Sequence, residues 1–167
     1  MGKVTDNWTP EGQRFMKELR ELAELEVRIG YQRDEEAESS NDDDDDEPRA
    51  NVVDVAMWNE LGTANIPSRP FMRDSVDKHM AAINHVLTAQ KDALLNGASA
   101  REILGTVGLF QQDLIQSEIK DGDFVANKPG TIAKKKKKGL GPYKPLIDNG
   151  TMRDSVHFHI VKKGSMD

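Results

Sequence analysis

Two hydrophobic periods divide the chain into elements. Between Pro10 and Glu24 apolar residues recur at helical spacing, and Thr9 is placed to cap the first turn of the helix that this spacing predicts. From Leu25 to Gln32 apolar and polar residues alternate, which is typical of a half-buried strand. A second alternating run, from Ser155 to Lys163, predicts a second strand.

Three more segments have a helical period. A short helix is predicted at 52–61, capped by Asn51, ended by Gly62 and carrying one apolar face formed by Val53, Ala56, Met57 and Leu61. The apolar positions from Met72 to Leu95 predict one continuous helix, about 35 Å long at 1.5 Å per residue.

The third of these segments begins at a capping box, Ser99-Ala100-Arg101-Glu102, and its helix is expected to end near Lys120. Gly105 and Gly108 lie inside it, and each costs about 1 kcal/mol of helix stability relative to alanine. We therefore expect both glycines to face a close packing partner.

Charge is separated into one acidic and one basic segment. Ten carboxylates and no basic residue lie between Asp34 and Glu47, so 33–49 is interpreted as a mobile acidic loop. This loop lacks the spaced glycine and glutamate of an EF-hand, and solvated disorder is favoured over calcium binding. Since the whole chain has a net charge of −6, the remainder is positive. Five consecutive lysines lie in the segment 121–143, which is rich in glycine and proline and is interpreted as an extended basic arm.

These elements predict an α+β fold for a single domain, 1–167, in which a small antiparallel sheet is packed by three or four helices. The two strands are separated by helices and cannot form a simple hairpin. They must meet through space, or each must pair with a neighbouring subunit. A two-stranded sheet is marginal in isolation, so its edges favour oligomerisation.

Composition narrows the function. Without cysteine the chain has no disulfide, thiol nucleophile or cysteine zinc site, which fits folding in a reducing cytoplasm. No apolar run reaches the roughly 18 residues of a membrane span, and the N-terminus has no apolar signal stretch, so we expect a soluble protein without membrane contact.

Candidate catalytic chemistry is sparse. His157 and His159 point to one side of the second predicted strand and could bind a metal, but no third ligand accompanies them, and a structural or solvent-facing role is favoured. Asp148 could act as an acid, although Asp-Asn-Gly is more often a turn. No nucleophile elbow or phosphate loop is present. We expect no enzyme, no cofactor and no metal.

The five lysines, Lys134, Lys135, Lys136, Lys137 and Lys138, have three open interpretations. They could grip DNA phosphates, dock on an acidic protein surface, or remain solvated. The nearest aromatic residue is Tyr143, which leaves no platform for base stacking. A solvated arm or a protein contact is favoured over DNA.

Two longer motifs resemble a known family. The run from Trp58 to Arg73, WNELGTANIPSRPFMR, is similar to a pattern NE(F/L)GT followed by IPxRPF(L/M)R, and the run from Lys144 to Val156, KPLIDNGTMRDSV, is similar to KPLIDTGxLRxSI. Both patterns are found in the neck and tail-completion proteins of tailed bacteriophages and prophages, also called virion-morphogenesis or head-tail joining proteins. The positions that carry the resemblance, and that are interface candidates, are Trp58, Glu60, Gly62, Thr63, Pro67, Arg69, Pro70, Phe71, Leu146, Asp148, Gly150, Met152 and Ser155.

The resemblance implies a non-catalytic virion protein, assembled in the host cytoplasm. Such a protein forms a homo-oligomeric ring, hexameric by resemblance, at the head-tail junction, where it completes or terminates the tail. Its implied partners are the tail tube and head connector proteins. The alternatives are a neck or packaging factor that contacts DNA through the lysine arm, and a metal-dependent hydrolase around His157 and His159.

Two motif residues also have physical interpretations of their own. Arg69 lies on a proline-stiffened loop, where its guanidinium could hold helix carbonyls or a carboxylate such as Glu60. Trp58 suits a core or an interface equally well.

Overall fold

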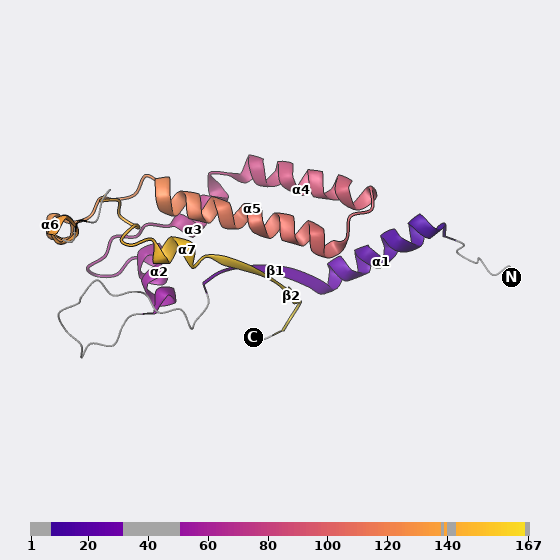
Figure 1. Ribbon diagram of the computed structural model, residues 1–167, viewed down its shortest axis with the longest axis horizontal. Coiled ribbons are helices and arrows are strands. Elements are labelled where there is room, and N and C mark those ends of the chain that lie inside the picture. Colours follow the sequence, from indigo (N-terminus) through magenta and orange to yellow (C-terminus); the bar gives the residue numbers. More distant parts are fainter. Residues whose placement is uncertain (1–7, 32–50, 138, 140–142, 166–167) are drawn as a thin grey trace.

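The structure is a computed structural model that describes residues 8–31, 51–137, 139 and 143–165. It is an α+β fold in which a helical hairpin lies along a two-stranded antiparallel sheet, with further helices at both ends of an elongated molecule (Figure 1). The predicted fold class is confirmed. The segment 33–49, predicted to be an acidic loop, lies outside the described residues.

The chain begins with a helix that runs directly into a strand. Helix α1 (Pro10–Glu24) is capped as predicted, since the Thr9 hydroxyl accepts a hydrogen bond from the Gly12 amide at 3.2 Å. Strand β1 (Leu25–Gly30) follows without a loop, because Leu25 already has the extended angles φ −105° and ψ 155°. The strand was predicted to reach Gln32, but it ends at Gly30; Tyr31 is not part of it, and Gln32 lies outside the described residues.

The two strands pair with each other. Strand β2 (His157–Lys162) runs antiparallel to β1, with Leu25 opposite Lys162 and Gly30 opposite His157. Of the two arrangements that the sequence left open, the structure has the one in which the strands meet through space. The sheet has only these two strands within the described residues, so each strand has one outer edge there that no other strand covers.

Helix α5 (Ala100–Asp121) packs across the sheet and is the central element of the fold (Figure 1). Its predicted capping box is confirmed, with the Ser99 hydroxyl and the Glu102 carboxylate each bonded to the other's backbone amide. A Cβ atom at Gly108 would lie 2.3 Å from the Phe158 ring of β2, so this glycine permits close packing as predicted. The same expectation is wrong for Gly105, where a Cβ atom would meet no atom within 4 Å beyond the backbone of its own helix and its chain neighbours.

The prediction of a single helix from Met72 to Leu95 is wrong. The structure has α3 (Phe71–Asp77) and α4 (Met80–Leu95), separated at Lys78 and His79, where His79 leaves helical geometry with φ −112° and ψ 16°. Buried Glu118 of α5 reaches this break, with one oxygen 3.0 Å from Lys78 Nζ and the other 3.2 Å from His79 Nε2. A contact with α5 therefore fixes a break within a continuous helical pattern.

Helix α2 (Val52–Leu61) has the predicted ends but not the predicted face. Asn51 caps it through the Val53 amide, and Gly62 ends it with φ 79°. Val52 and Ala56 are the buried residues, whereas Met57 and Leu61 are 47% and 65% exposed. The helix is apolar around most of its circumference, so periodicity could not select the side that packs on the core.

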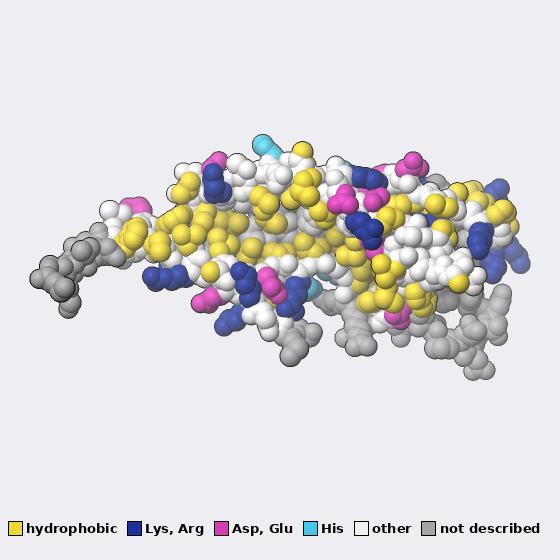
Figure 2. All heavy atoms as spheres, turned by 180° about the vertical axis from the view of Figure 1, so that it is seen from behind, with side chains coloured by type: hydrophobic (Ala, Val, Ile, Leu, Met, Phe, Trp, Pro, Cys, Tyr) yellow, Lys and Arg dark blue, Asp and Glu magenta, His cyan; other side chains and the backbone are white. Residues whose placement is uncertain are grey.

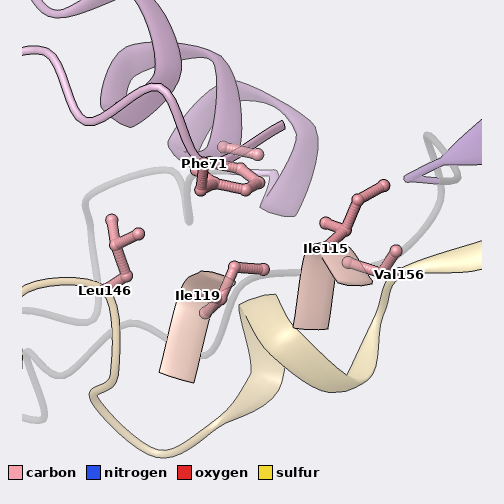
Figure 3. Packing of buried hydrophobic residues seen from close by; sticks show 6 residues of the cluster. Phe71, Ile115, Ile119, Leu146 and Val156 are labelled. Atoms are coloured by element: carbon pink, nitrogen blue, oxygen red, sulfur yellow. The ribbon is translucent and has the colours of Figure 1, made fainter. Parts of the chain in front are cut away.

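The segment 121–143 is less irregular than expected, because it contains helix α6 (Pro129–Lys137) at one end of the molecule (Figure 1). A short helix that the sequence did not predict, α7 (Thr151–Asp154), precedes β2. The main hydrophobic cluster joins α2, α3 and α5 to the segments around α7, and its largest side chains point toward one another (Figure 3). Its members are Ala56, Phe71, Ile115, Ile119, Leu146 and Val156.

Candidate functional site: the junction of the two motifs

The two motifs, 58–73 and 144–156, are far apart in sequence and meet around Phe71. This ring is fully buried, and Leu146 and Val156 from the second motif belong to the same cluster (Figure 3). Met152 packs against that cluster from α7. The hydrophobic positions of both motifs thus build one junction between α2, α3 and the C-terminal segment.

Glu60 organises the start of α3. Its carboxylate accepts hydrogen bonds from the backbone amides of Met72 at 2.9 Å and Arg73 at 3.2 Å. A carboxylate at a helix N-terminus satisfies amides that have no partner within the helix. Of the two kinds of partner that the sequence left open for Arg69, the carboxylate of Glu60 is not the one observed, since no bond between them is present and both have other partners.

The loop between α2 and α3 is tightly folded. Thr63 accepts the amides of Asn65 and Ile66 at its hydroxyl, while the Ser68 hydroxyl donates to the Glu60 carbonyl at 2.8 Å. A Cβ atom at Gly62 would lie 2.9 Å from the Ser68 amide nitrogen, so glycine is required there by space as well as by its positive φ. In the same loop Pro67 is half-buried, and Pro70 takes the position before the first residue of α3.

Arg69 ties three segments together. Its side chain is only 5% exposed, and it donates to the Val125 carbonyl at 3.0 Å and to the side-chain oxygens of Asn59 at 2.9 Å and Asn127 at 3.4 Å. Burial lowers the pKa of Arg69 from its ordinary value. The sequence left helix carbonyls or a carboxylate open as partners, and the carbonyl that Arg69 binds belongs to a loop instead. Neither Asn59 nor Asn127 was recognised from the sequence.

Asn127 extends this network to the second motif, because its amide nitrogen donates to the carbonyls of Tyr143 and Lys144 at 3.4 and 3.3 Å. The sequence offers one indication of this role: Asn127 lies two residues before Pro129, the residue at which α6 begins. The chain from Asn59 through Arg69 and Asn127 to Lys144 therefore links both motifs by polar contacts as well as apolar ones.

Lys135 points inward, which corrects the interpretation of the lysine run as part of an extended arm. It is 8% exposed and donates to the carbonyls of Lys144 and Ile147, with Asp148 Oδ1 at 3.8 Å. Desolvation lowers the pKa of Lys135, the Asp148 charge opposes that shift, and Arg69 adds to it. Lys135 therefore anchors α6 to the second motif.

The other described lysines of the run behave as expected for solvent-facing charges. Lys134, Lys136 and Lys137 are exposed, and Lys136 Nζ lies 5.5 Å from the centre of the Tyr143 ring. Lys138 lies outside the described residues. The single run thus contains an internal anchor and three surface cations.

The Asp148-Asn149-Gly150 sequence forms the turn that its chemistry favours. Gly150 has φ 98°, and Asn149 accepts the Thr151 amide at 3.0 Å. Asp148 faces Lys135, and Ser155 is buried where α7 ends. The polar residues of the second motif thus hold the backbone that enters β2.

Two further predicted positions have separate surroundings. Trp58 is 38% exposed and lies beside the exposed side chains of Met57 and Leu61, so it is accessible to another protein chain. His157 and His159 lie opposite Gly30 and Arg28, neither of which supplies a metal ligand. Within the described ranges no group of three or more His, Asp, Glu or Cys side chains is placed to hold a metal ion.

Tyr31 is a junction residue that the sequence did not single out. Its ring meets Phe71 edge-on, with centres 6.4 Å apart and planes at 82°, and among the described residues its buried hydroxyl has no hydrogen-bond partner. Burial, and secondarily the Glu60 charge, raise the pKa of Tyr31 far above its ordinary value of 10.0.

None of the helices that the structure describes is long and apolar enough to span a membrane. No family model, curated protein or solved structure matches the chain.

Proposed function

We propose that this chain is a structural protein of the tailed-phage neck, which forms a ring at the head-tail junction, completes or terminates the tail, and docks it to the head connector. The observation that supports it most is the junction itself. The two motifs that carry the family resemblance pack around Phe71, and Glu60, Arg69 and Lys135 all bond to backbone groups there. Their contacts fix the geometry of the chain, which is what an assembly component requires.

The hydrophobic surface supports association with other chains. Among the described residues twelve large hydrophobic side chains are exposed, against eleven hydrophobic residues that are buried. Figure 2 shows hydrophobic side chains gathered in a band along the long axis of one face, starting at the end that carries α1. Monomeric proteins rarely expose apolar patches of more than a few hundred Å², and larger ones mark interaction sites.

The direct test is genetic and biochemical. Deletion of the coding sequence from the phage or prophage genome that carries it should leave filled heads and separate tails in induced lysates, visible by negative-stain electron microscopy. Added purified protein should restore joined particles. Normal virions from the deletion strain, or a purified protein that stays monomeric at every concentration, would refute the proposal.

A second candidate function is contact with DNA through α6. Within the described parts of the chain no ion pair neutralises Lys134, Lys136 or Lys137. If all three contact phosphates, the logarithm of the affinity should fall with the logarithm of salt concentration with a slope of about −2.7, since each phosphate contact contributes about −0.9. Replacing all three by Gln should abolish binding to duplex DNA, whereas no binding by the wild-type chain eliminates this candidate.

A further inference from the structure

The two ends of the elongated molecule carry different apolar features. At one end α1 lies beside the turn that joins α4 to α5, and at the other lie α2 and α6 (Figure 1). A cavity opens at the first end, and an exposed aromatic side chain lies at the second. One copy of the chain therefore presents both halves of a possible head-to-tail contact.

The cavity has a volume of about 160 Å³ and lies between α1 and the α4–α5 turn. Phe15, Leu94 and Leu95 supply its apolar lining. The cavity is open to solvent on one side, and its other walls are polar, among them Glu11, Arg14 and Glu18. A side chain of a second molecule can therefore enter it from outside, and an amphipathic ring such as indole suits a site with both apolar and polar walls.

The walls of the cavity are held in place by polar contacts between α1 and the turn. The Arg14 guanidinium donates to the Gly97 carbonyl, and the buried Glu18 carboxylate accepts the Ala100 amide at 2.9 Å. The second of these bonds also satisfies the first amide of α5, so the same contact that fixes this wall of the cavity stabilises the start of that helix. A site that is formed before binding loses little entropy when it is filled.

At the other end, the apolar face of α2 that does not pack on the core is exposed to solvent. Met57, Trp58 and Leu61 are 47%, 38% and 65% exposed, while Val52 and Ala56 on the opposite side enter the core. Tryptophan is among the residues most enriched at the centres of interfaces. Helix α2 is itself fixed by its Asn51 cap and by the Glu60 contacts that join it to α3.

We propose that a second copy of this chain fills the cavity, with Trp58 of one copy inserted between α1 and the α4–α5 turn of the next. This inference rests on the proposed ring function and names its subunit contact. The proposed contact is heterologous: each copy fills the cavity of the next, and repeating the contact produces a ring when the rotation closes. The competing arrangement is a two-fold dimer, in which each copy fills the other's cavity reciprocally and assembly stops at two copies.

Charge favours the same pairing. The titratable groups that line the cavity are Glu11, Arg14 and Glu18, which together carry one net negative charge. The end that brings Trp58 also carries the exposed lysines of α6, and Figure 2 shows basic side chains gathered there, at the end opposite α1. The attraction is weak and screened beyond about 8 Å at physiological salt, so the apolar contact determines the affinity.

The absence of native cysteine permits a specific cross-linking test. Leu61→Cys places a thiol next to Trp58 on α2, and Leu95→Cys places one at the cavity, with both positions more than 60% exposed. The two single variants are mixed and treated with a short bis-maleimide. We expect a cross-linked pair that contains one copy of each variant, and a ladder of larger products from the double variant.

Two comparisons make the test specific. Leu87→Cys, on the middle of α4 and 46% exposed, should give no link with Leu61→Cys. Adding Trp58→Ala to Leu61→Cys should weaken association about 30-fold, which corresponds to the roughly 2 kcal/mol of an interface hot spot. Should Trp58→Ala disturb folding by circular dichroism, Leu95→Asp at the exposed cavity rim gives the same comparison by native mass spectrometry.

The outcomes separate this contact from the function on which it rests. Links between Leu61→Cys copies alone would indicate an isologous contact and overturn the inference. Links between positions 61 and 95 in a double variant that stops at the dimer would indicate a reciprocal two-fold dimer and also overturn it. Rings seen by native mass spectrometry without any link between positions 61 and 95 would also overturn it, while the proposed function would stand. A chain that remains monomeric and unlinked at every concentration would overturn both.

Discussion

Gly108→Ala tests the packing of α5 on the sheet most directly. In the structure a Cβ at this position would lie 2.3, 2.7 and 2.8 Å from three atoms of the Phe158 ring. One of the three is Cγ, the atom through which the ring is attached, so rotation of the ring about its own axis does not relieve the clash. The ring or the helix must move.

Two opposing terms determine the size of the effect. Alanine improves helix stability by about 1 kcal/mol relative to glycine, while an additional methyl group in a packed core costs about 1–3 kcal/mol. We expect Gly108→Ala to lower the free energy of unfolding by about 1 kcal/mol. Gly105→Ala is the matched control, since it changes the same helix where a Cβ would meet no atom within 4 Å beyond the backbone of its own helix and its chain neighbours, and it should raise the free energy of unfolding by about 1 kcal/mol.

The assay is thermal unfolding followed by circular dichroism. For a chain of this length a difference of about 2 kcal/mol between the two variants corresponds to roughly 4–8 °C in Tm. Adding Phe158→Leu should remove most of the cost of Gly108→Ala, because the two residues are in contact and their effects should not add. If Gly108→Ala is as stabilising as Gly105→Ala, the close packing of α5 on β2 is refuted.

Three other substitutions test the junction of the motifs. Tyr31→Phe removes a buried hydroxyl without a described partner and should raise Tm slightly. The pKa of Tyr31 is raised in the folded chain, so above pH 10.0 the unfolded chain loses the hydroxyl proton first. The free energy of unfolding of the wild type should therefore fall as pH rises above 10.0. Denaturant titrations should show a smaller fall for Tyr31→Phe. Arg69→Lys cannot reproduce three divergent hydrogen bonds and should cost about 1.5–3 kcal/mol by urea unfolding, whereas exposed Arg73→Lys should change stability little. Lys135→Gln should lower Tm by several degrees, and an unchanged Tm, equal to that of exposed Lys134→Gln, would refute its anchoring role.

The helix ends illustrate what local sequence can specify. Thr9, Asn51 and the Ser99–Glu102 box each cap the helix predicted for them, because a cap involves residues only two or three positions apart. The same holds for Gly62 and Gly150, whose positive φ values match their predicted turns. Such features depend on the backbone nearby and not on the rest of the fold.

The motif positions were recognisable from their order along the chain, but their roles were not. Glu60 was one of the partners left open for Arg69, and it caps α3 instead. Lys135 resembled its four neighbours in the lysine run, and it alone among the described ones is buried. A linear pattern identifies a residue type and spacing, whereas the partner depends on which backbone groups the fold brings within reach.

The α+β class, both strands and the bounds of α1, α2 and α5 were thus predictable, because hydrophobic period and capping are properties of neighbouring residues. The break between α3 and α4 was not, because it depends on Glu118, 39 residues from His79. The tertiary structure also decided the side of α2 that is buried and the contact of Arg69 with Val125, 56 residues away. These choices follow from desolvation and packing between distant segments, and the local pattern is compatible with more than one of them.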